Sequence, residues 1–322
     1  MKKSVLIALA ILICTTNSFS QSNECYGDKK ELILGNTTPY TKVKIGAIEG
    51  YFLIDFGTTG STIDINNFIN GKPKLNPQNK FDNFDFYGSW GAVSLSIQNH
   101  SSITGLVNFK QAGIIGTDFL SLNIFTIDYE NKAVYRANSN NFCSNESLND
   151  LGFKATSTVG YYSNDLSKLN NTCVANIPTV PIKIGNIGAI AQIDPGFDDF
   201  KHRHSLNINQ ALYNALIDAG IVLIENPSAN LTLSTCVSNL SESVKAYKLP
   251  EGISFAITAI DGSPITFSDI NIFLKQPQAQ AASCGGIGTW KIPAAQIGAS
   301  FLVDSKRVIF DPFKSKVWFY TK

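Results

Sequence analysis

One stretch of the chain occurs twice, and this repeat limits the possible folds more than any other feature. Residues 44–57 match residues 183–196 without a gap at an offset of 139, and seven of the fourteen positions are identical. Each copy is a mostly apolar run that ends in an aspartate, Asp55 or Asp194, with a glycine two positions later. Asp is a poor strand residue, so its repeated place at the end of such a run needs a reason. The repeat predicts two copies of one unit, each bringing one Asp-x-Gly turn.

A second repeat lies near the end of each unit. The matching residues are Gly116/Gly298, Phe119/Phe301 and Leu120/Leu302 at an offset of 182, then Asp128/Asp311 and Val134/Val317 at an offset of 183. Each half therefore has matching sequence segments near its start and near its end. This is a long-period duplication and not a solenoid of short repeats.

Composition narrows the class of protein. The chain has 322 residues, 44% of them hydrophobic and 16% charged, which suits two medium domains with a large core. The 26 basic residues balance 25 acidic ones. This balance argues against a nucleic acid or an anionic membrane surface as partner.

The first twenty residues resemble a signal peptide. A basic start, a short apolar run over Val5–Ile13 and small residues before Gln21 are the features of such a segment. The apolar run is too short to span a bilayer, and no later stretch reaches that length. We therefore expect an exported protein, secreted or periplasmic. A lipoprotein attached through Cys14 and a buried N-terminal strand are the alternatives.

Export implies an oxidising compartment, where disulfides persist. Five cysteines remain after position 20: Cys25, Cys143, Cys173, Cys236 and Cys284. The odd count leaves one of them free or paired elsewhere. Cys236 with Cys284 is the first expected pair. Cys25 with Cys143 would tie the start of the first half to its end, and Cys143 with Cys173 competes with it.

Short strand patterns dominate both halves. In chain order they lie around Glu31–Leu34, Thr41–Ile48, the run into Asp55, Asn230–Leu233, Ser254–Ile260 and Ile265–Leu274. The pattern predicts an all-β chain of two duplicated halves. We place the first half at residues 24–150 and the second at 151–322, with the polar stretch 137–172 connecting them.

Helices and one hairpin are also predicted. Ser205–Gly220 is the best helix, because apolar residues recur at i, i+4 and i+8 and Gly220 can cap its end. A short helix is possible near Ile63–Ile69. Between Phe84 and Ile97 the order strand, Gly-rich tip, strand predicts a hairpin. Its aromatic tip would be partly exposed, which is costly unless the tip covers something.

Duplicated halves that pack about a pseudo-twofold axis bring equivalent loops together, here those of Asp55 and Asp194. Two carboxylates held close cannot both ionise cheaply, so they share one proton. The ionised member can take a proton from water while the protonated member polarises a carbonyl. This pair is suited to hydrolysing an amide without a metal, a cofactor or a covalent intermediate.

At these residues the chain resembles the pepsin-like, two-lobed aspartic peptidases. The motifs that carry the resemblance are Ile54–Gly57 and Ile193–Gly196, Ile114–Gly116 and Ala295–Gly298, the closing strands, and Tyr87–Ser89. The resemblance covers nearly all of residues 30–322. It implies two β-barrel-like lobes, a cleft that binds extended peptides, and Asp55 and Asp194 as the catalytic dyad. Because one chain holds both aspartates, no homodimer is needed and we expect a monomer.

The resemblance also implies residues that contact a substrate. Tyr87 would lie on a hairpin flap that closes over a bound peptide, and Ser89 would lie beside it. Gly57 and Gly196 let backbone approach the carboxylates. Thr58 would bind the outer oxygen of the first carboxylate.

The chain departs from the family at both turns. The family pattern is Asp-Thr/Ser-Gly, but the residues after the two aspartates are Phe56 and Pro195, which have no hydroxyl. Phe197 likewise replaces the hydroxyl residue that Thr58 retains in the first turn. Losing such support alters the geometry of a site. The main hypothesis is an exported aspartic endopeptidase, and the alternative is a pepsin-like protein that binds extended peptides with weak catalysis or none.

The segment after the second turn carries further polar residues. Asp198 and Asp199 would add negative charge near the dyad. His202 and His204 alternate, so both could face one side of a strand and bind a metal. No third ligand cluster accompanies them, so we expect no metal site.

Overall fold

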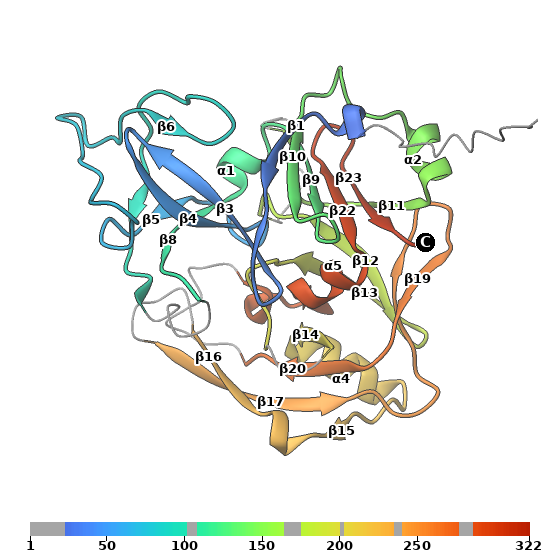
Figure 1. Ribbon diagram of the computed structural model, residues 1–322. Coiled ribbons are helices and arrows are strands. Elements are labelled where there is room, and N and C mark those ends of the chain that lie inside the picture. The colour runs from blue at the N-terminus through green and yellow to red at the C-terminus, as the bar shows by residue number, and fades with distance from the viewer. Residues whose placement is uncertain (1–22, 102–107, 164–174, 200–202, 235–239, 277–285) are drawn as a thin grey trace, which may run out of the picture.

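The computed structural model (Figure 1) describes residues 23–101, 108–163, 175–199, 203–234, 240–276 and 286–322. Within these ranges the chain is mostly β-structure in sheets of six, seven and ten strands, with a few short helices. The all-β expectation is confirmed. The structure finds no helix, within the same ranges, that is long and apolar enough to cross a membrane.

The seven-stranded sheet belongs to the first half and leads to Asp55. Its strands are β2 (Ile33–Gly35), β3 (Thr38–Ile45), β4 (Ile48–Ile54), β8 (Gln111–Ile115), β5 (Thr62–Ile63) and β7 (Ser96–Ile97), with β6 (Phe84–Asp85) beside β3. The last three residues of β4 are all buried. Burial on both faces explains the unbroken apolar run that precedes Asp55.

The ten-stranded sheet belongs to the second half and leads to Asp194. Its strands are β12 (Thr179–Ile184), β13 (Ile187–Ile193), β14 (His204–Ile208), β15 (Ile224–Glu225), β16 (Leu231–Ser234), β17 (Ser241–Lys248), β18 (Phe255–Thr258), β19 (Pro264–Phe267), β20 (Ile270–Leu274) and β21 (Ala294–Ile297). In Figure 1, β15, β16 and β17 form the lower edge of the molecule. Strand β13 pairs in parallel with β21, as β4 pairs with β8 in the first half.

The six-stranded sheet joins the two halves. Its order is β1 (Asp28–Glu31), β10 (Ala133–Ala137), β9 (Ile124–Asp128), β22 (Arg307–Asp311), β23 (Lys316–Tyr320) and β11 (Phe153–Ser157). At its centre β9 and β22 are antiparallel, with Phe125 opposite Phe310 and Ile127 opposite Val308. With the offset of 183 between the halves, Phe125 corresponds to Val308 and Ile127 corresponds to Phe310, so each pair corresponds to the other. The register is therefore unchanged when the halves exchange places, as a pseudo-twofold axis requires.

Short helices complete each half. Among the described residues they are α1 (Thr117–Leu120), α2 (Asn145–Leu151), α4 (Gln210–Asp218) and α5 (Ala299–Asp304), and 3-10 turns cover Asn23–Tyr26, Pro227–Ala229 and Ile287–Thr289. Helices α1 and α5 follow the equivalent strands β8 and β21. They occupy the repeated segment that contains Phe119 and Phe301.

Two helix predictions differ from the structure. The helix predicted over Ser205–Gly220 begins only at Gln210, because the preceding residues form β14 and the Asn209 side chain caps the helix by accepting from Leu212 N. The helix near Ile63–Ile69 does not form, and that segment consists of the end of β5 followed by turns. There, Asp64 accepts the backbone N–H of Asn66, which favours a turn.

The predicted hairpin forms only in part, because β6 pairs with β3 and β7 with β5, and the segment folds back on itself through isolated bridges. The aromatic side chains of its tip are less exposed than expected. The Phe86 and Tyr87 side chains are buried, and the Phe86 ring stacks on Phe125 of the six-stranded sheet at 5.9 Å between centroids. Trp90 packs edge-on against Phe119 at 4.8 Å. Aromatic rings contribute large buried areas, so the tip folds down onto the sheet.

A disulfide between Cys25 and Cys143 closes the first half on itself, which confirms one of the expected pairs. This bond excludes the competing pair of Cys143 with Cys173. The predicted pair of Cys236 with Cys284 lies outside the described residues, as do Cys173 and the whole signal segment with Cys14.

Candidate active site

The same backbone bonds hold the two Asp turns. Asp55 N donates to Ile115 O at 3.0 Å, and Asp194 N donates to Ile297 O at 2.9 Å. Each turn is bound again at its third residue after the aspartate, since Thr58 O accepts from α1 at 2.9 Å and Phe197 O accepts from α5 at 2.8 Å. The duplicated sequence thus produces a duplicated backbone around each carboxyl group.

Each aspartate also accepts the N–H of the glycine two residues on. Gly57 N donates to Asp55 Oδ1 at 2.7 Å, and Gly196 N donates to Asp194 Oδ1 at 2.8 Å. These bonds turn each carboxyl group back over its own loop. They explain why the turn requires a short link between the aspartate and the glycine.

The two turns meet at their glycines. A Cβ added to Gly57 would lie 2.4 Å from Asp194 Cγ, and one added to Gly196 would lie 2.9 Å from Asp55 Oδ2. No side chain fits at either position, so glycine is required by the approach of the opposite carboxyl group. The structure therefore brings Asp55 and Asp194 together, as the repeat predicted.

Burial and mutual repulsion change the proton affinity of the pair. Burial, and then the charge of Asp194, raise the pKa of Asp55 well above its ordinary value. Burial also raises the pKa of Asp194, but a hydrogen bond from the Asp55 carboxyl opposes that rise. Both carboxyl groups therefore bind a proton more readily than an exposed aspartate does, as a pair that shares one proton requires.

Sequence reasoning missed one residue of this site. Gln296 on β21 donates from its Nε2 atom to Asp194 Oδ2 at 2.5 Å. Asn207 on β14 donates to Gln296 Oε1 at 2.7 Å. The available signal was a glutamine inside the otherwise apolar run of Ala294–Ile297, at a position where the first half has Ile114.

The residues that replace the expected hydroxyls are buried. Phe56 stacks on Phe310 at 3.7 Å between centroids and meets the edge of Tyr161 at 5.7 Å. Phe197 packs edge-on against Phe273 at 6.2 Å. Pro195 is also buried. Phe56 and Phe197 thus serve the core of the molecule instead of the carboxyl groups.

Tyr87 and Ser89, two of the predicted substrate residues, make no hydrogen bond to the dyad within the described ranges. Tyr87 has φ +60°, donates its hydroxyl to Val134 O on β10 at 2.5 Å, and lies beneath Arg136 at 5.3 Å. Ser89 is exposed at the hairpin tip and accepts from Gly91 N at 3.2 Å. The role of Tyr87 in covering a peptide stays a prediction, and here its hydroxyl is bound to β10.

The polar residues after the second turn are buried and bonded locally. The Ser205 hydroxyl lies 2.7 Å from Asp199 Oδ1 and 3.2 Å from Asp198 Oδ1. Thr37, from the first half, donates to Asp198. Asp198 thus bonds across the two halves. His204 is buried in β14 with its Nδ1 atom 2.5 Å from Ser268 O, and His202 lies outside the described residues.

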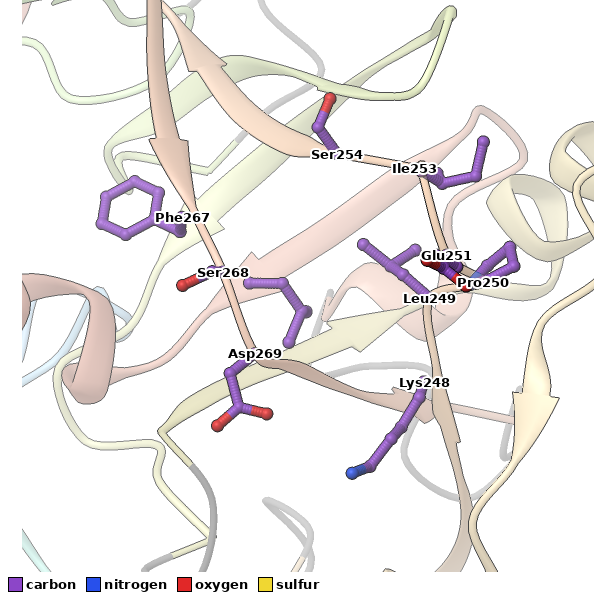
Figure 2. Close-up of a pocket in the computed structure, with 11 residues that line it drawn as sticks. Lys248, Leu249, Pro250, Glu251, Ile253, Ser254, Phe267, Ser268 and Asp269 are labelled. Carbon is purple, nitrogen blue, oxygen red and sulfur yellow. The ribbon is translucent and has the colours of Figure 1, made fainter.

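A hollow of about 480 Å³ opens in the second half, between residues 248–254 and 267–270 (Figure 2). Its lining includes Leu249, Ile253 and Phe267, and its charged members are Lys248, Glu251 and Asp269. Neither aspartate of the dyad lines it. The hollow is therefore separate from the paired carboxyl groups.

Comparison with known proteins gave distant likenesses among solved structures. No protein-family model matches the chain, and no curated protein matches it. The crystal structure of an aspartic proteinase from Irpex lacteus matches 92% of this chain and 97% of its own, with 11% identity and a TM-score of 0.44. A crystal structure of edgp matches 91% of this chain and 94% of its own, with 11% identity and a TM-score of 0.42. The function of this chain is therefore inferred from its own residues.

Proposed function

We propose that the chain is an exported, monomeric aspartic endopeptidase that hydrolyses peptide bonds in extended polypeptides. The observation that carries the proposal is the pair of carboxyl groups, Asp55 buried and Asp194 half-buried, which symmetric turns bring together and whose pKa values are both raised. Such a pair supplies an acid and a base at one place. Residues 24–150 and 151–322 are proposed as the two lobes, with the substrate between them.

The chemistry requires only the dyad and water. Asp194 accepts a proton from the water as its oxygen attacks the carbonyl carbon, while Asp55 gives its proton to the carbonyl oxygen. The resulting diol collapses when Asp194 returns its proton to the leaving nitrogen and Asp55 recovers one from a diol hydroxyl. Both carboxyl groups end as they began, so neither a metal nor a cofactor is needed.

The test is cleavage of denatured casein between about pH 3 and 7, the range in which such a pair should hold one proton. Asp55→Asn and Asp194→Asn should each reduce the rate by at least about a thousandfold, because each removes one half of the acid–base pair. Circular dichroism of all three proteins checks that each is folded. Cleavage that survives either substitution would rule out the dyad as its source.

A second candidate is a protein that binds extended peptides without cleaving them. The observation that favours it is the placement of Phe56 and Phe197 in the core, which leaves the turns without the expected hydroxyls. Tight binding of casein peptides by a wild-type protein that cleaves nothing at any tested pH would support it. Tyr87, Ser89, Thr58, Gly57 and Gly196 are proposed contacts of the bound chain in either case.

A further inference from the structure

Gln296 lies at the centre of a polar row in the second half. On β21 it stands opposite Gln192 of β13 and opposite Asn207 of β14. Cross-strand neighbours share a face of a sheet, so the three amide side chains form one row across three strands. The row ends beside Asp194, which follows β13 directly.

The bonds of this row fix which way the Gln296 amide points. Asn207 Nδ2 donates to Gln296 Oε1 at 2.7 Å, which leaves the Nε2 atom turned toward Asp194 Oδ2 at 2.5 Å. Asp194 Oδ1 already accepts from Gly196 N at 2.8 Å. Both oxygens of Asp194 are thus supplied with N–H donors, and donors of this kind favour the charged form of a carboxyl group.

The first half has no such row. The equivalents of Gln192 and Gln296 are Leu53 and Ile114, which pair with each other in the same parallel register. Within the described residues, Asp55 is bound by the backbone N–H groups of the two turns and by Asp194, and by no other side chain. The two carboxyl groups therefore lie in different surroundings despite equivalent backbones.

We propose that Gln296 is a positioning residue of the dyad, which holds Asp194 as the ionised member so that Asp55 carries the shared proton. This inference rests on the proposed peptidase function and deepens it, because it assigns a separate role to each aspartate. Asp194 is then the base that takes the proton of water, and Asp55 is the acid that protonates the carbonyl oxygen. Asn207 acts one step further away, by keeping the amide of Gln296 in the donating orientation.

Lys275 acts in the same direction as Gln296, Tyr40 stays neutral, and two further aspartates follow the second turn. Lys275, at the end of β20, lowers the proton affinity of Asp194 through its charge and pairs with Glu242 at 3.6 Å. Tyr40 on β3 is buried and donates to Gln111 at 2.8 Å, and its pKa is raised to about 12, so it stays neutral. Asp198 and Asp199 follow the second turn and are bonded to Ser205.

The test compares substitutions that give each half the residue of the other. Gln296→Ile installs the residue found at position 114 and removes the donor to Asp194. Gln192→Leu installs the residue found at position 53 and is the matched control, because Gln192 is a buried member of the same row and its Nε2 atom has no hydrogen-bond partner within the described ranges. Gln296→Glu is the conservative variant, since a protonated carboxyl can accept from Asn207 and donate to Asp194.

The kinetic readout is the dependence of kcat on pH. Gln296→Ile should lower kcat roughly tenfold to a hundredfold through misplacement of the carboxylate. It should also move the acid limb of the profile, which reports Asp194, upward by about one pH unit. Gln296→Glu should stay active at the acid end and lose activity as its own carboxyl ionises. Gln192→Leu should change neither quantity.

A readout without activity comes from ¹³C NMR of protein labelled at the Asp carboxyl carbons. In an Asp55→Asn background Asp194 titrates alone, so coupling between the two groups does not obscure its pKa. Adding Gln296→Ile should raise the pKa of Asp194 by about one unit. Adding Gln192→Leu should leave it unchanged.

The outcomes separate this inference from the proposed function. An unmoved Asp194 titration and acid limb in Gln296→Ile, with casein still cleaved, would overturn the role of Gln296 and leave the peptidase standing. Equal shifts in Gln192→Leu would also overturn it, because the effect would then belong to the polar row as a whole. A raised Asp194 pKa in a protein that cleaves nothing would keep Gln296 as the group that holds the carboxylate and would refute the peptidase.

Discussion

The two Asp turns have equivalent backbones and different side chains. In the first turn the residue after the aspartate, Phe56, stacks on Phe310 in the sheet that joins the halves. In the second turn that place is taken by Pro195, and a side chain from a neighbouring strand, Gln296, reaches the carboxylate. Backbone bonds therefore set where the carboxyl groups lie, while the side chains give each of them different surroundings.

Asp64 and Asn209 are a second pair of positions with equivalent backbone bonds and different side-chain bonds. Asp64 N and Asn209 N donate to the equivalent carbonyls of Ala112 and Ala294, at 2.8 and 3.0 Å. The Asp64 carboxylate accepts from backbone N–H groups and organises a local turn. The Asn209 side chain both donates and accepts, because it caps α4 and also holds a loop. One backbone position therefore carries two different local structures.

The largest expected effect on stability comes from removing the Phe56 ring, which the first turn places in the core. Phe56→Ala should lower the free energy of unfolding by about 3–5 kcal/mol, because it empties a fully buried ring site. Pro195→Ala, at the equivalent place in the second turn, should cost less than about 1.5 kcal/mol because it removes far less buried volume. Thermal or urea unfolding of both variants measures the difference. Equal losses would show that the two turns are anchored alike.

Asn209 should show the next largest effect. Its Nδ2 atom donates to carbonyls of Ile287, Trp290 and Ile292, and its Oδ1 atom accepts from Leu212 N and Ala294 N. Asn209→Ala should cost roughly 2–4 kcal/mol, since it removes a helix cap and leaves buried groups unpaired.

Asn209→Asp is the sharper version of this test, because it gives the second half the residue of the first. The new carboxylate would face three carbonyl oxygens without a hydrogen to donate, so the cost should be at least as large as for alanine. Urea unfolding of the two variants compares them directly. A stable Asn209→Asp protein would mean that the loop of residues 287–292 does not depend on the amide.

The sequence predicts the parts of the site that the repeat encodes. Asp55 and Asp194 could be placed together because a duplicated unit with a twofold axis brings equivalent turns into contact. Gln296 could not, because it acts across strands on a residue 102 positions away, and a strand pattern says nothing about which pairs of strands lie side by side. The orientation of Tyr87 was missed for a related reason, since its carbonyl partner, Val134, lies on a distant strand.

The errors in predicting helices and strands from the sequence have local causes. Ile208, Leu212 and Leu216 have helical spacing, but Ile208 is the last residue of β14 and only the other two belong to α4. The spacing continues by chance through Asn209, which ends the strand and caps the helix. The run Ile265–Leu274 contains two strands because Asp269 adopts φ +58°, and this left-handed turn separates β19 from β20. Periodicity alone does not reveal such a break.

The dyad should make stability depend on pH in a defined direction. The folded-state pKa of Asp55 is raised, so between the ordinary carboxyl value and the raised one the folded chain holds a proton that the unfolded chain has lost. Stability contributed by this group is therefore full at low pH and is lost as pH rises through the folded-state pKa. Asp55→Asn removes the loss, so the variant should be more stable than wild type at pH 7.

Melting temperatures between pH 3 and 7 check this prediction. The two proteins should converge near pH 3, where Asp55 is protonated in both the folded and unfolded chain. Asp194→Asn should gain less, because an asparagine there cannot accept from both Gly196 N and Gln296 Nε2. A variant Asp55→Asn that is less stable than wild type at pH 7 would contradict the raised pKa of Asp55.

The smallest expected effect concerns Thr58, the hydroxyl residue that the first turn retains. Within the described residues its hydroxyl makes no hydrogen bond, and its carbonyl supplies the bond to α1 that Phe197 O supplies to α5. Thr58→Val keeps the shape and removes only the hydroxyl, so the free energy of unfolding should change by less than about 0.5 kcal/mol. The casein cleavage rate should change by less than about threefold. A loss as large as that of Gln296→Ile would mean that Asp55 also gains a side-chain donor when substrate binds, and the two turns would then be supported alike during the reaction.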